Sequence, residues 1–242
     1  MIPSARQRNS TSVDRDKRRE TEEWGTYRKL IENNYINQRD AYDRLHAVVT
    51  DQAPAGFRFL DVACGDASLT VEALLGTSVG QYYGIELSPA AIYFAARSLR
   101  SLSCPRELVT GDMIEVLADW QKPVDVTWIG LSLHHFASAQ KRQIMSEIHR
   151  LVAPSGLFLI YENSSPDGED RDGWLQRWDA CRTVWTELSD DGWMALNGHV
   201  HSSDYPETDS GWRQLGMEAG FSEARTLFVS PTDLFRMFSF RA

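Results

Sequence analysis

The 242-residue chain has 42% hydrophobic residues, enough to form one sizeable core without disulfides or metals. Its formal net charge of −9 argues against a nucleic-acid partner, because binding to a phosphate backbone depends on clustered lysine and arginine. Three widely separated cysteines, no apolar run of membrane-spanning length and no hydrophobic signal core predict a soluble cytoplasmic protein with no membrane partner.

The beginning of the chain divides into a polar tail and two expected helices. Residues 1–20 are rich in serine, arginine and aspartate with almost no apolar content, and we expect this tail to be disordered. Apolar residues then recur at helical spacing over 24–31 and over 42–49, which predicts two helices separated near Asn33. The aromatic residues of these helices either cover a ligand site or pack onto the core.

The middle of the chain alternates short apolar runs with amphipathic helical patterns. The apolar runs predict strands at 59–62, 82–85, 107–110, 124–130 and 157–161. The patterns between them predict helices at 68–75, 89–101, 113–120 and 140–152. Strands that alternate with helices form a parallel sheet with right-handed crossovers, so we expect a doubly wound α/β core.

After residue 163 the regular alternation breaks. Residues 164–208 are rich in aspartate, glycine, serine and tryptophan, with one helix predicted at 174–188. We expect this segment to be an insertion at the carboxyl edge of the sheet. Three further elements complete the chain, namely a helix at 211–219 and strands at 221–229 and 234–240.

Three strand ends carry groups suited to a nucleotide-like ligand. The first strand runs into the small-residue turn Ala-Cys-Gly-Asp-Ala (63–67), where the backbone can approach a ligand and the next helix offers unpaired N–H groups. The second ends at Glu86, an acid that can accept hydrogen bonds from both ribose hydroxyls. The third precedes Asp112, whose carboxylate can accept from an adenine amino group. Together these strand ends predict a nucleotide-type pocket.

In this order the motifs resemble those of the class I S-adenosylmethionine-dependent methyltransferases, over residues 55–163 by motif and 21–242 by layout. That family's turn has the pattern Asp/Glu-x-Gly-x-Gly-x-Gly, and here Ala63 and Ala67 replace two of the glycines. The resemblance implies a single Rossmann-like domain with a seven-stranded, mostly parallel sheet and a C-terminal antiparallel hairpin. Its parts would be a helical lid (21–52), a cofactor-binding core (55–163), a substrate-side insertion (164–208) and a last helix with the hairpin (209–242).

The same resemblance implies S-adenosyl-L-methionine as cofactor, S-adenosyl-L-homocysteine as product and a small molecule as substrate. The residues implied to bind the cofactor follow the first four strands, namely Asp61, Ala63, Gly65, Glu86, Leu87, Asp112, Met113, Ile129, Gly130 and Leu131. A dinucleotide dehydrogenase is a weaker match, because the turn lacks the full G-x-G-x-x-G spacing.

The fourth strand leads into Leu133-His134-His135-Phe136, which resembles the Leu-His-Asp-Trp run of plant-type O-methyltransferases. In those enzymes the histidine is the general base, so the resemblance implies His134 as the base, with His135 as the second catalytic candidate. Alternatively, the two histidines cap the strand end or contact the cofactor. The chain lacks here the Asp/Asn-Pro-Pro-aromatic run of enzymes that methylate exocyclic amines of DNA or protein glutamine, which argues against those substrates.

Further side chains are candidates for contacting the substrate. Tyr161, Glu162 and Asn163 end the fifth strand beside the pocket, and Tyr27 belongs to the expected lid. His199 and His201 lie in the insertion, and in an extended segment both would point to one face. We expect no metal site, because nothing in the sequence fixes the geometry of these histidines.

These observations predict a methyltransferase for a small-molecule metabolite, with a hydroxyl acceptor and a histidine base. The alternative reaction is methylation of an amine, a thiol or a carboxylate, and a carboxylate would need no base. The alternative of another class is a protein that binds S-adenosylmethionine without catalysis, as a regulator or a subunit of a complex.

Overall fold

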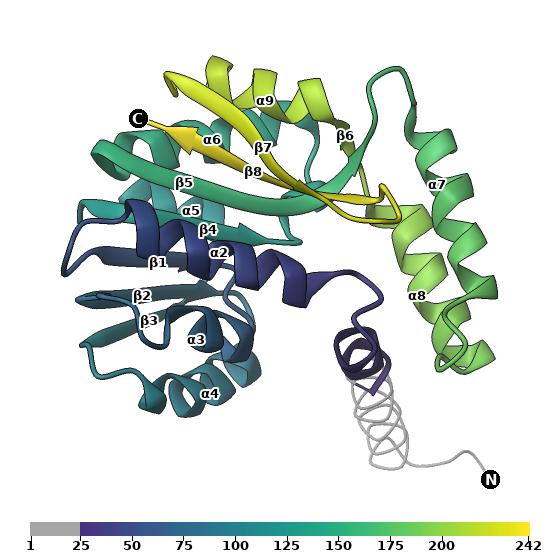
Figure 1. Cartoon of the computed structure of the whole chain (residues 1–242), viewed down its shortest axis with the longest axis horizontal. Helices are drawn as coiled ribbons and strands as arrows, with labels where there is room; N and C mark the ends of the chain where they lie inside the picture. Colours follow the sequence, from purple (N-terminus) through teal and green to yellow (C-terminus); the bar gives the residue numbers. More distant parts are fainter. Residues whose placement is uncertain (1–24) are drawn as a thin grey trace, which may run out of the picture.

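The computed structural model describes residues 25–242, so the tail expected to be disordered, 1–20, lies outside the described residues. The fold is built on a sheet with strand order β3-β2-β1-β4-β5-β8-β7 (Figure 1). A two-residue strand, β6 (Glu207–Thr208), pairs with the end of β5 outside this order. The predicted seven-stranded, doubly wound sheet is therefore confirmed, with β6 as an addition. The seven strands are β1 (Arg58–Val62), β2 (Gln81–Glu86), β3 (Arg106–Thr110), β4 (Val124–Gly130), β5 (Val152–Ser165), β7 (Glu223–Val229) and β8 (Phe235–Arg241).

The parallel part of the sheet brings two loops together at its carboxyl edge. Strands β3, β2, β1, β4 and β5 are parallel, and β8 runs antiparallel between β5 and β7. Strands β1 and β4 pair from Phe59 with Val126 to Val62 with Ile129. The loops after these two strands therefore emerge side by side, at the point of the sheet where ligands bind in open α/β folds.

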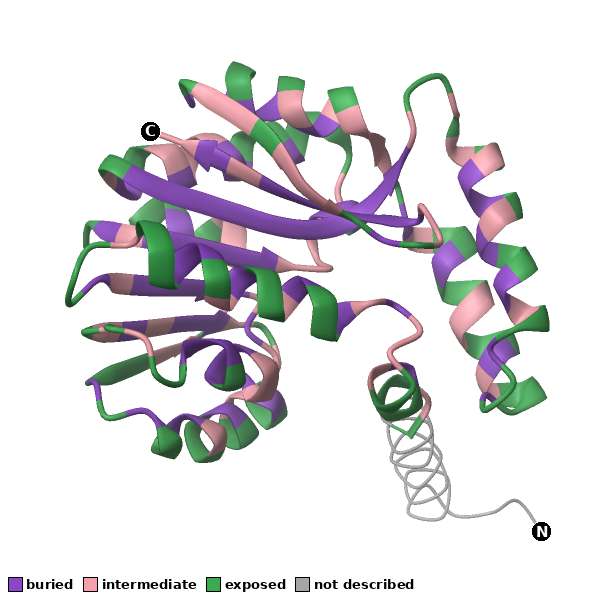
Figure 2. Ribbon diagram, viewed as in Figure 1, coloured by how far each residue is buried: buried purple, intermediate pink, exposed green. Residues whose placement is uncertain are grey.

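Helices cover both faces of the sheet (Figure 1). One layer is α2 (Gln38–Gln52), α3 (Ser68–Leu74) and α4 (Pro89–Ser98), and the other is α5 (Met113–Asp119), α6 (Ser138–Leu151) and α9 (Asp209–Glu218). Buried and exposed residues alternate along these helices in Figure 2, as expected of amphipathic helices that pack on a sheet. Within residues 25–242, none of the helices has the length and apolarity needed to cross a membrane.

Two helical segments precede β1, as the spacing of apolar residues predicts. Residues 25–32 are helical, a turn follows, and α2 begins after Asn37. Helix α2 buries Ala41, Leu45 and Val49 against the sheet side of the fold. The first helical segment lies beyond the carboxyl edge of the sheet, near the insertion that follows β5 (Figure 1).

That insertion folds into two neighbouring helices, α7 (Arg171–Ala180) and α8 (Asp190–Ser203) (Figure 1). The single helix predicted at 174–188 is wrong, because α7 ends at Ala180 and the chain then turns back. The reversal lets Trp178 stack on Trp193, with ring centroids 6.0 Å apart. The sequence gives no helical signal for α8 because it is rich in glycine, serine, asparagine and aspartate, which are weak helix formers.

The insertion contacts the segment that precedes α2. The rings of Tyr35 and Trp185 stack with centroids 5.3 Å apart. The Tyr35 hydroxyl accepts the N–H of Glu187 at 3.2 Å, and the Lys29 ammonium donates to the Glu187 carbonyl at 2.6 Å. The two segments expected to flank a substrate are thus joined by side-chain contacts.

Candidate functional site

The turn after β1 holds three residues in the left-handed backbone region. Ala63, Gly65 and Ala67 have φ angles of 57°, 55° and 54°. Glycine enters this region freely, whereas other residues enter it at a cost of about 1–2 kcal/mol. The two alanines therefore keep the turn geometry for which the resembling family uses glycine. A Cβ atom at Gly65 would meet no atom within 4 Å, so a ligand can lie against this backbone.

Glu86, at the end of β2, fixes this turn. One carboxylate oxygen accepts the N–H of Gly65 at 3.0 Å, and the other accepts the N–H of Ser88 at 2.8 Å. Each oxygen keeps a further lone pair that a ribose hydroxyl could use. The acid predicted from the sequence thus lies against the turn, and its contact with a cofactor stays a prediction.

A cavity of about 330 Å³ lies between this turn and the helices before β1. Its walls include the turn with the start of α3 (63–70), Gly130, and the side chains of Tyr27, Ile31, Gln38 and Tyr42. The Gln38 amide donates to the Tyr27 hydroxyl at 3.2 Å. Its Oε1 atom is buried and has no hydrogen-bond partner within residues 25–242. Gln38 is therefore a buried polar residue of the cavity wall.

Asp61, near the end of β1, precedes the turn. Its side chain is buried and accepts the Tyr82 hydroxyl at 2.8 Å. Burial raises the pKa of Asp61 to about 7, hydrogen bonds from Thr70 and Tyr82 oppose this rise, and the charge of Glu86 adds to it. Asp61 is not among the residues that line the cavity, so its effect on a ligand would act through the turn.

Three other predicted cofactor residues follow β2 and β3. Asp112 caps α5 by accepting the N–H of Ile114 at 2.8 Å. Met113 is partly buried against the core that α5 and α6 share. Leu87 is 67% exposed. All three lie at the carboxyl edge of the sheet, and their contacts with a cofactor stay predictions.

The end of β4 contributes backbone rather than side chains. Ile129 is fully buried in the core, so its side chain does not reach a ligand, whereas Gly130 lines the cavity. Leu131 has a φ of 52°, and its N–H donates to the Tyr161 carbonyl at 2.7 Å. Tyr161 is also fully buried, and its hydroxyl donates to the Ile36 carbonyl at 2.8 Å. Its side chain therefore packs in the core and does not reach the substrate side, contrary to the prediction.

Glu162 binds the segment that carries the histidine pair. Its fully buried carboxylate accepts the N–H groups of Ser132, Leu133 and His134 at 2.9, 2.7 and 3.3 Å. It also lies 2.7 Å from Nδ1 of the His134 ring. Because an ionised carboxylate only accepts, Nδ1 of a neutral His134 carries the proton and Nε2 keeps a lone pair. Glu162 therefore orients His134. This role differs from the substrate contact that we predicted for Glu162.

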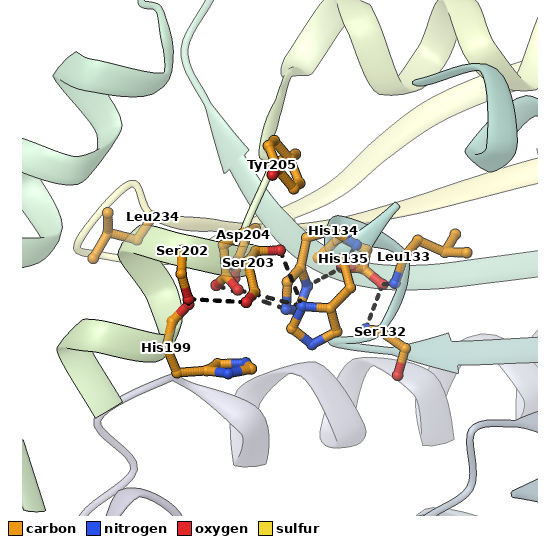
Figure 3. Close-up of polar contacts among 12 residues, drawn as sticks. Ser132, Leu133, His134, His135, His199, Ser202, Ser203, Asp204, Tyr205 and Leu234 are labelled. Carbon is orange, nitrogen blue, oxygen red and sulfur yellow. Dashed lines mark hydrogen bonds and ion pairs between the residues drawn. The ribbon is translucent and has the colours of Figure 1, made fainter. Parts of the chain in front are cut away.

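Asp204, which follows the last residue of α8, lies beside both histidines (Figure 3). One of its carboxylate oxygens accepts the Asn163 amide at 2.7 Å and lies 3.7 Å from Nε2 of His134. The other lies 3.3 Å from Nδ1 of His135. Partial burial acts to lower the pKa of His135, but Asp204, the Ser203 carbonyl and Glu162 outweigh it, so the pKa of His135 is raised.

The two histidines differ in access. The side chain of His134 is 7% exposed, whereas that of His135 is 39% exposed. Their ring centroids lie 4.1 Å apart, and the His199 ring lies 5.3 Å from that of His135 (Figure 3). His135 is therefore the member of the pair that a substrate can touch.

His199 and His201 do not share a face. Our prediction required an extended segment, and it is wrong because this segment is helical. Both lie in helix α8, where residues two apart point about 200° away from each other. His199 faces the histidine pair, whereas Nε2 of His201 lies 2.9 Å from the Asp179 carboxylate of α7. The structure thus brings His199 to the site and turns His201 away from it.

Sequence reasoning missed Asp204 and Gln38, and it predicted Asn163 as a substrate contact rather than as the partner of Asp204. Asp204 reaches the histidines because α8 ends beside them, where the N–H of Tyr205 donates to the His134 carbonyl at 2.7 Å. Gln38 is a polar residue that only the folded chain buries. No local pattern marks Asp204 or Gln38.

The order of the sheet, the turn of small residues and the acid after β2 define a class I methyltransferase fold. Residues 59–156 match the family model described as a methyltransferase domain. An uncharacterized methyltransferase of Synechocystis sp. is 27% identical over 111 residues, which span 46% of this chain and 49% of the relative. A demethylmenaquinone methyltransferase of Staphylococcus epidermidis is 30% identical over 139 residues, 55% of each chain. The matches thus span about half the length of the curated relatives.

Solved structures share the fold over most of this chain. Magnesium protoporphyrin IX methyltransferase of Synechocystis, with bound S-adenosylhomocysteine, has a TM-score of 0.59 and 16% identity over 85% of this chain and 84% of its own. An O-methyltransferase family protein of Burkholderia thailandensis has a TM-score of 0.61 and 15% identity over 84% of this chain and 55% of its own. Residues 59–156 thus match a methyltransferase domain, and most of the chain shares the fold of methyltransferases whose structures hold S-adenosylhomocysteine or S-adenosylmethionine.

Proposed function

We propose that this chain transfers the methyl group of S-adenosylmethionine to an oxygen atom of a small-molecule acceptor. One juxtaposition carries the proposal. Gly130, the last residue of β4, lines the cavity beside the β1 turn, and His134 and His135 follow it within five residues. Neither histidine lines the cavity, so we infer from their short separation from Gly130 along the chain that the pair lies on the acceptor side of a methyl donor held there.

The residues around the cavity fit this donor. The open side of Gly65 leaves room for a ligand against the backbone. Glu86 has lone pairs for two ribose hydroxyls. When bound, S-adenosylmethionine supplies a methyl group on a positively charged sulfur, which keeps the bonding electron pair as the methyl leaves.

His135 is the proposed proton acceptor. A hydroxyl acceptor must give up its proton as the new O–C bond forms, and a positioned base contributes on the order of 10²–10⁴-fold. His135 is the more exposed ring of the pair, and the Asp204 carboxylate behind it would stabilise the imidazolium ion. His134 is buried and oriented by Glu162, so we assign it to positioning rather than to contact with the acceptor.

The relatives support transfer to small molecules but differ in the acceptors that their names give. One name gives demethylmenaquinone and another gives magnesium protoporphyrin IX. We therefore propose a reaction class from the residues of this chain and name no acceptor. A carboxylate acceptor would need no base, and it is the alternative if His135 proves dispensable.

Donor turnover tests the proposal. We would incubate the full-length protein with S-adenosylmethionine and fractions of a metabolite extract and measure S-adenosylhomocysteine. We expect turnover with a hydroxyl-bearing fraction, and His135→Ala should lower it about 100-fold or more without weakening S-adenosylhomocysteine binding.

His201→Ala is the matched control, because His201 pairs with Asp179 away from the site. Full turnover by His135→Ala would exclude the histidine base. Binding of S-adenosylhomocysteine without turnover in any fraction would instead identify a binding protein without catalysis.

A further inference from the structure

Three potential metal ligands meet where β4 and α8 end, namely His134, His135 and Asp204 (Figure 3). Their candidate ligand atoms all lie within 4.8 Å of one another. The two closest approaches are 3.3 Å, between Nδ1 of His135 and one Asp204 oxygen, and 3.7 Å, between Nε2 of His134 and the other. His134 and Asp204 are buried, while His135 opens toward solvent. The cluster is therefore a compact group of donors with one accessible side.

The hydrogen bonds around the cluster leave two acceptor atoms, Nε2 of His134 and a carboxylate oxygen of Asp204, facing each other. Nδ1–H of a neutral His134 donates to Glu162, so Nε2 presents a lone pair to an Asp204 oxygen that already accepts from Asn163. The second oxygen of Asp204 is buried, makes no hydrogen bond of good geometry within the described residues, and faces Nδ1 of His135 at 3.3 Å. A positively charged ion between these acceptor groups would stabilise them.

We propose that the cluster of His134, His135 and Asp204 binds a divalent transition-metal ion of the zinc type. Imidazole and carboxylate ligands suit zinc and its first-row neighbours, whereas magnesium and calcium prefer sites made of oxygen alone. Two ligands of a tetrahedral zinc ion, each about 2.0–2.1 Å from the metal, lie roughly 3.3–3.4 Å apart. The separations of 3.3 and 3.7 Å, which are measured to the two different oxygens of Asp204, are close to this value. The three ligand atoms, now within 4.8 Å of one another, would draw closer together around the ion.

Glu162 supplies the second argument for a metal. Histidine ligands of metals almost always donate their other ring nitrogen to a carboxylate or a carbonyl, which fixes the tautomer and orients the ring. His134 has this arrangement, with Nδ1 held at 2.7 Å by the buried Glu162 carboxylate. Three protein ligands leave a fourth position open, which is typical of catalytic rather than structural zinc sites. The accessible side of the cluster is the side of His135.

The metal site rests on the proposed function in one respect only, namely which molecule would occupy the fourth coordination position of the ion. There it deepens that proposal, because an acceptor hydroxyl bound to the metal would lose its proton more readily. With the metal bound, both imidazoles would act as ligands, and the proton of the acceptor hydroxyl would pass to solvent rather than to His135. In the metal-free protein His135 remains the proton acceptor. Metal binding itself requires neither the methyl donor nor the acceptor.

The test is a binding measurement on the full-length protein after treatment with a chelator. We expect Zn²⁺ to bind with one equivalent per chain by calorimetry and equilibrium dialysis, and Mg²⁺ not to bind. Asp204→Asn keeps the shape of the side chain and should weaken Zn²⁺ binding at least tenfold. Glu162→Gln removes the orienting carboxylate and should weaken it roughly 10–100-fold.

His201→Ala is again the matched control, because it removes a histidine of the same helix that pairs with Asp179. Circular dichroism and S-adenosylhomocysteine binding would verify that each variant is folded. No Zn²⁺ binding by the unaltered chain, or equal binding by Asp204→Asn, would overturn the inference and leave a proton between these groups.

The failures of the two proposals are distinguishable. Turnover without Zn²⁺ binding would refute the metal site alone. Zn²⁺ binding at this cluster without turnover of any acceptor would refute the methyl-transfer proposal alone.

Discussion

Glu86→Ala is expected to weaken the binding of S-adenosylhomocysteine by roughly ten- to a hundredfold. The carboxylate holds the turn through the N–H groups of Gly65 at 3.0 Å and Ser88 at 2.8 Å, and in the complex it would also accept two ribose hydroxyls. Hydrogen bonds to a charged group contribute about 1.5–3 kcal/mol each, and we take the lower end because Glu86 is half-buried. Two lost ribose bonds then cost about 3 kcal/mol, which is roughly a hundredfold, and one costs about tenfold.

Calorimetric titration of S-adenosylhomocysteine into the full-length variants measures this loss. Glu86→Gln keeps one acceptor oxygen and should fall between the unaltered chain and Glu86→Ala. Glu72→Ala, an exposed acid on α3 near the same turn, is the control and should bind normally. If circular dichroism shows that Glu86→Ala is folded and the variant binds S-adenosylhomocysteine with unchanged affinity, Glu86 does not bind the ribose and the prediction is refuted.

The remaining predictions concern the turn, a buried acid and the two segments at the carboxyl edge. Gly65→Val should abolish S-adenosylhomocysteine binding, because a β-branched residue is strained at a φ of +55°, while Ala63→Gly should bind normally; binding by the valine variant would show that the turn does not approach the ligand. The pKa of Asp61, about 7 in the folded chain, exceeds the unfolded value of about 3.9, so the folded state holds the extra proton and stability should fall as pH rises from about 4 to 7 and level off above. Asp61→Asn should remove up to roughly 4 kcal/mol of this dependence in denaturant titrations, and an unchanged slope would contradict the raised pKa. A chain lacking 1–20 should keep its turnover, and S-adenosylhomocysteine should raise hydrogen-exchange protection in 25–52 and 199–205 as well as near Glu86; protection confined to the strand ends would exclude a lid.

Local sequence patterns predicted the parts of the fold that local physics determines. The period of the apolar residues located every strand of the parallel sheet and the helices between them, because each element buries one face. The acid at the end of β2 and the small-residue turn were likewise readable, since a strand end fixes where such groups lie. Helix α8 escaped because burial of Trp193 and Val200, and not helix propensity, stabilises it.

The substrate side of the site could not be predicted in the same way, because its contacts span long stretches of chain. Asp204 meets His134 through an insertion that the sequence pattern did not resolve into α7 and α8. Tyr161 was expected at the site, but strand alternation turns its ring toward the carbonyl of Ile36, 125 residues away along the chain. The side chains of Glu162 and Asn163 next to it were given no orienting role, because that role appears only once the histidine segment folds over β5.

The donor side and the acceptor side of this site depend on different parts of the chain. The family match covers 59–156, which contains the turn, Glu86 and the histidine pair but neither Glu162 nor Asp204. These two carboxylates set the tautomer of His134 and face the accessible ring of His135. The histidines are therefore in a region common to the family, while the groups that decide whether they bind a proton or a metal ion lie beyond it. The insertion, which places Asp204 after helix α8, can thus change the chemistry at the end of β4 without disturbing the turn that would hold the methyl donor.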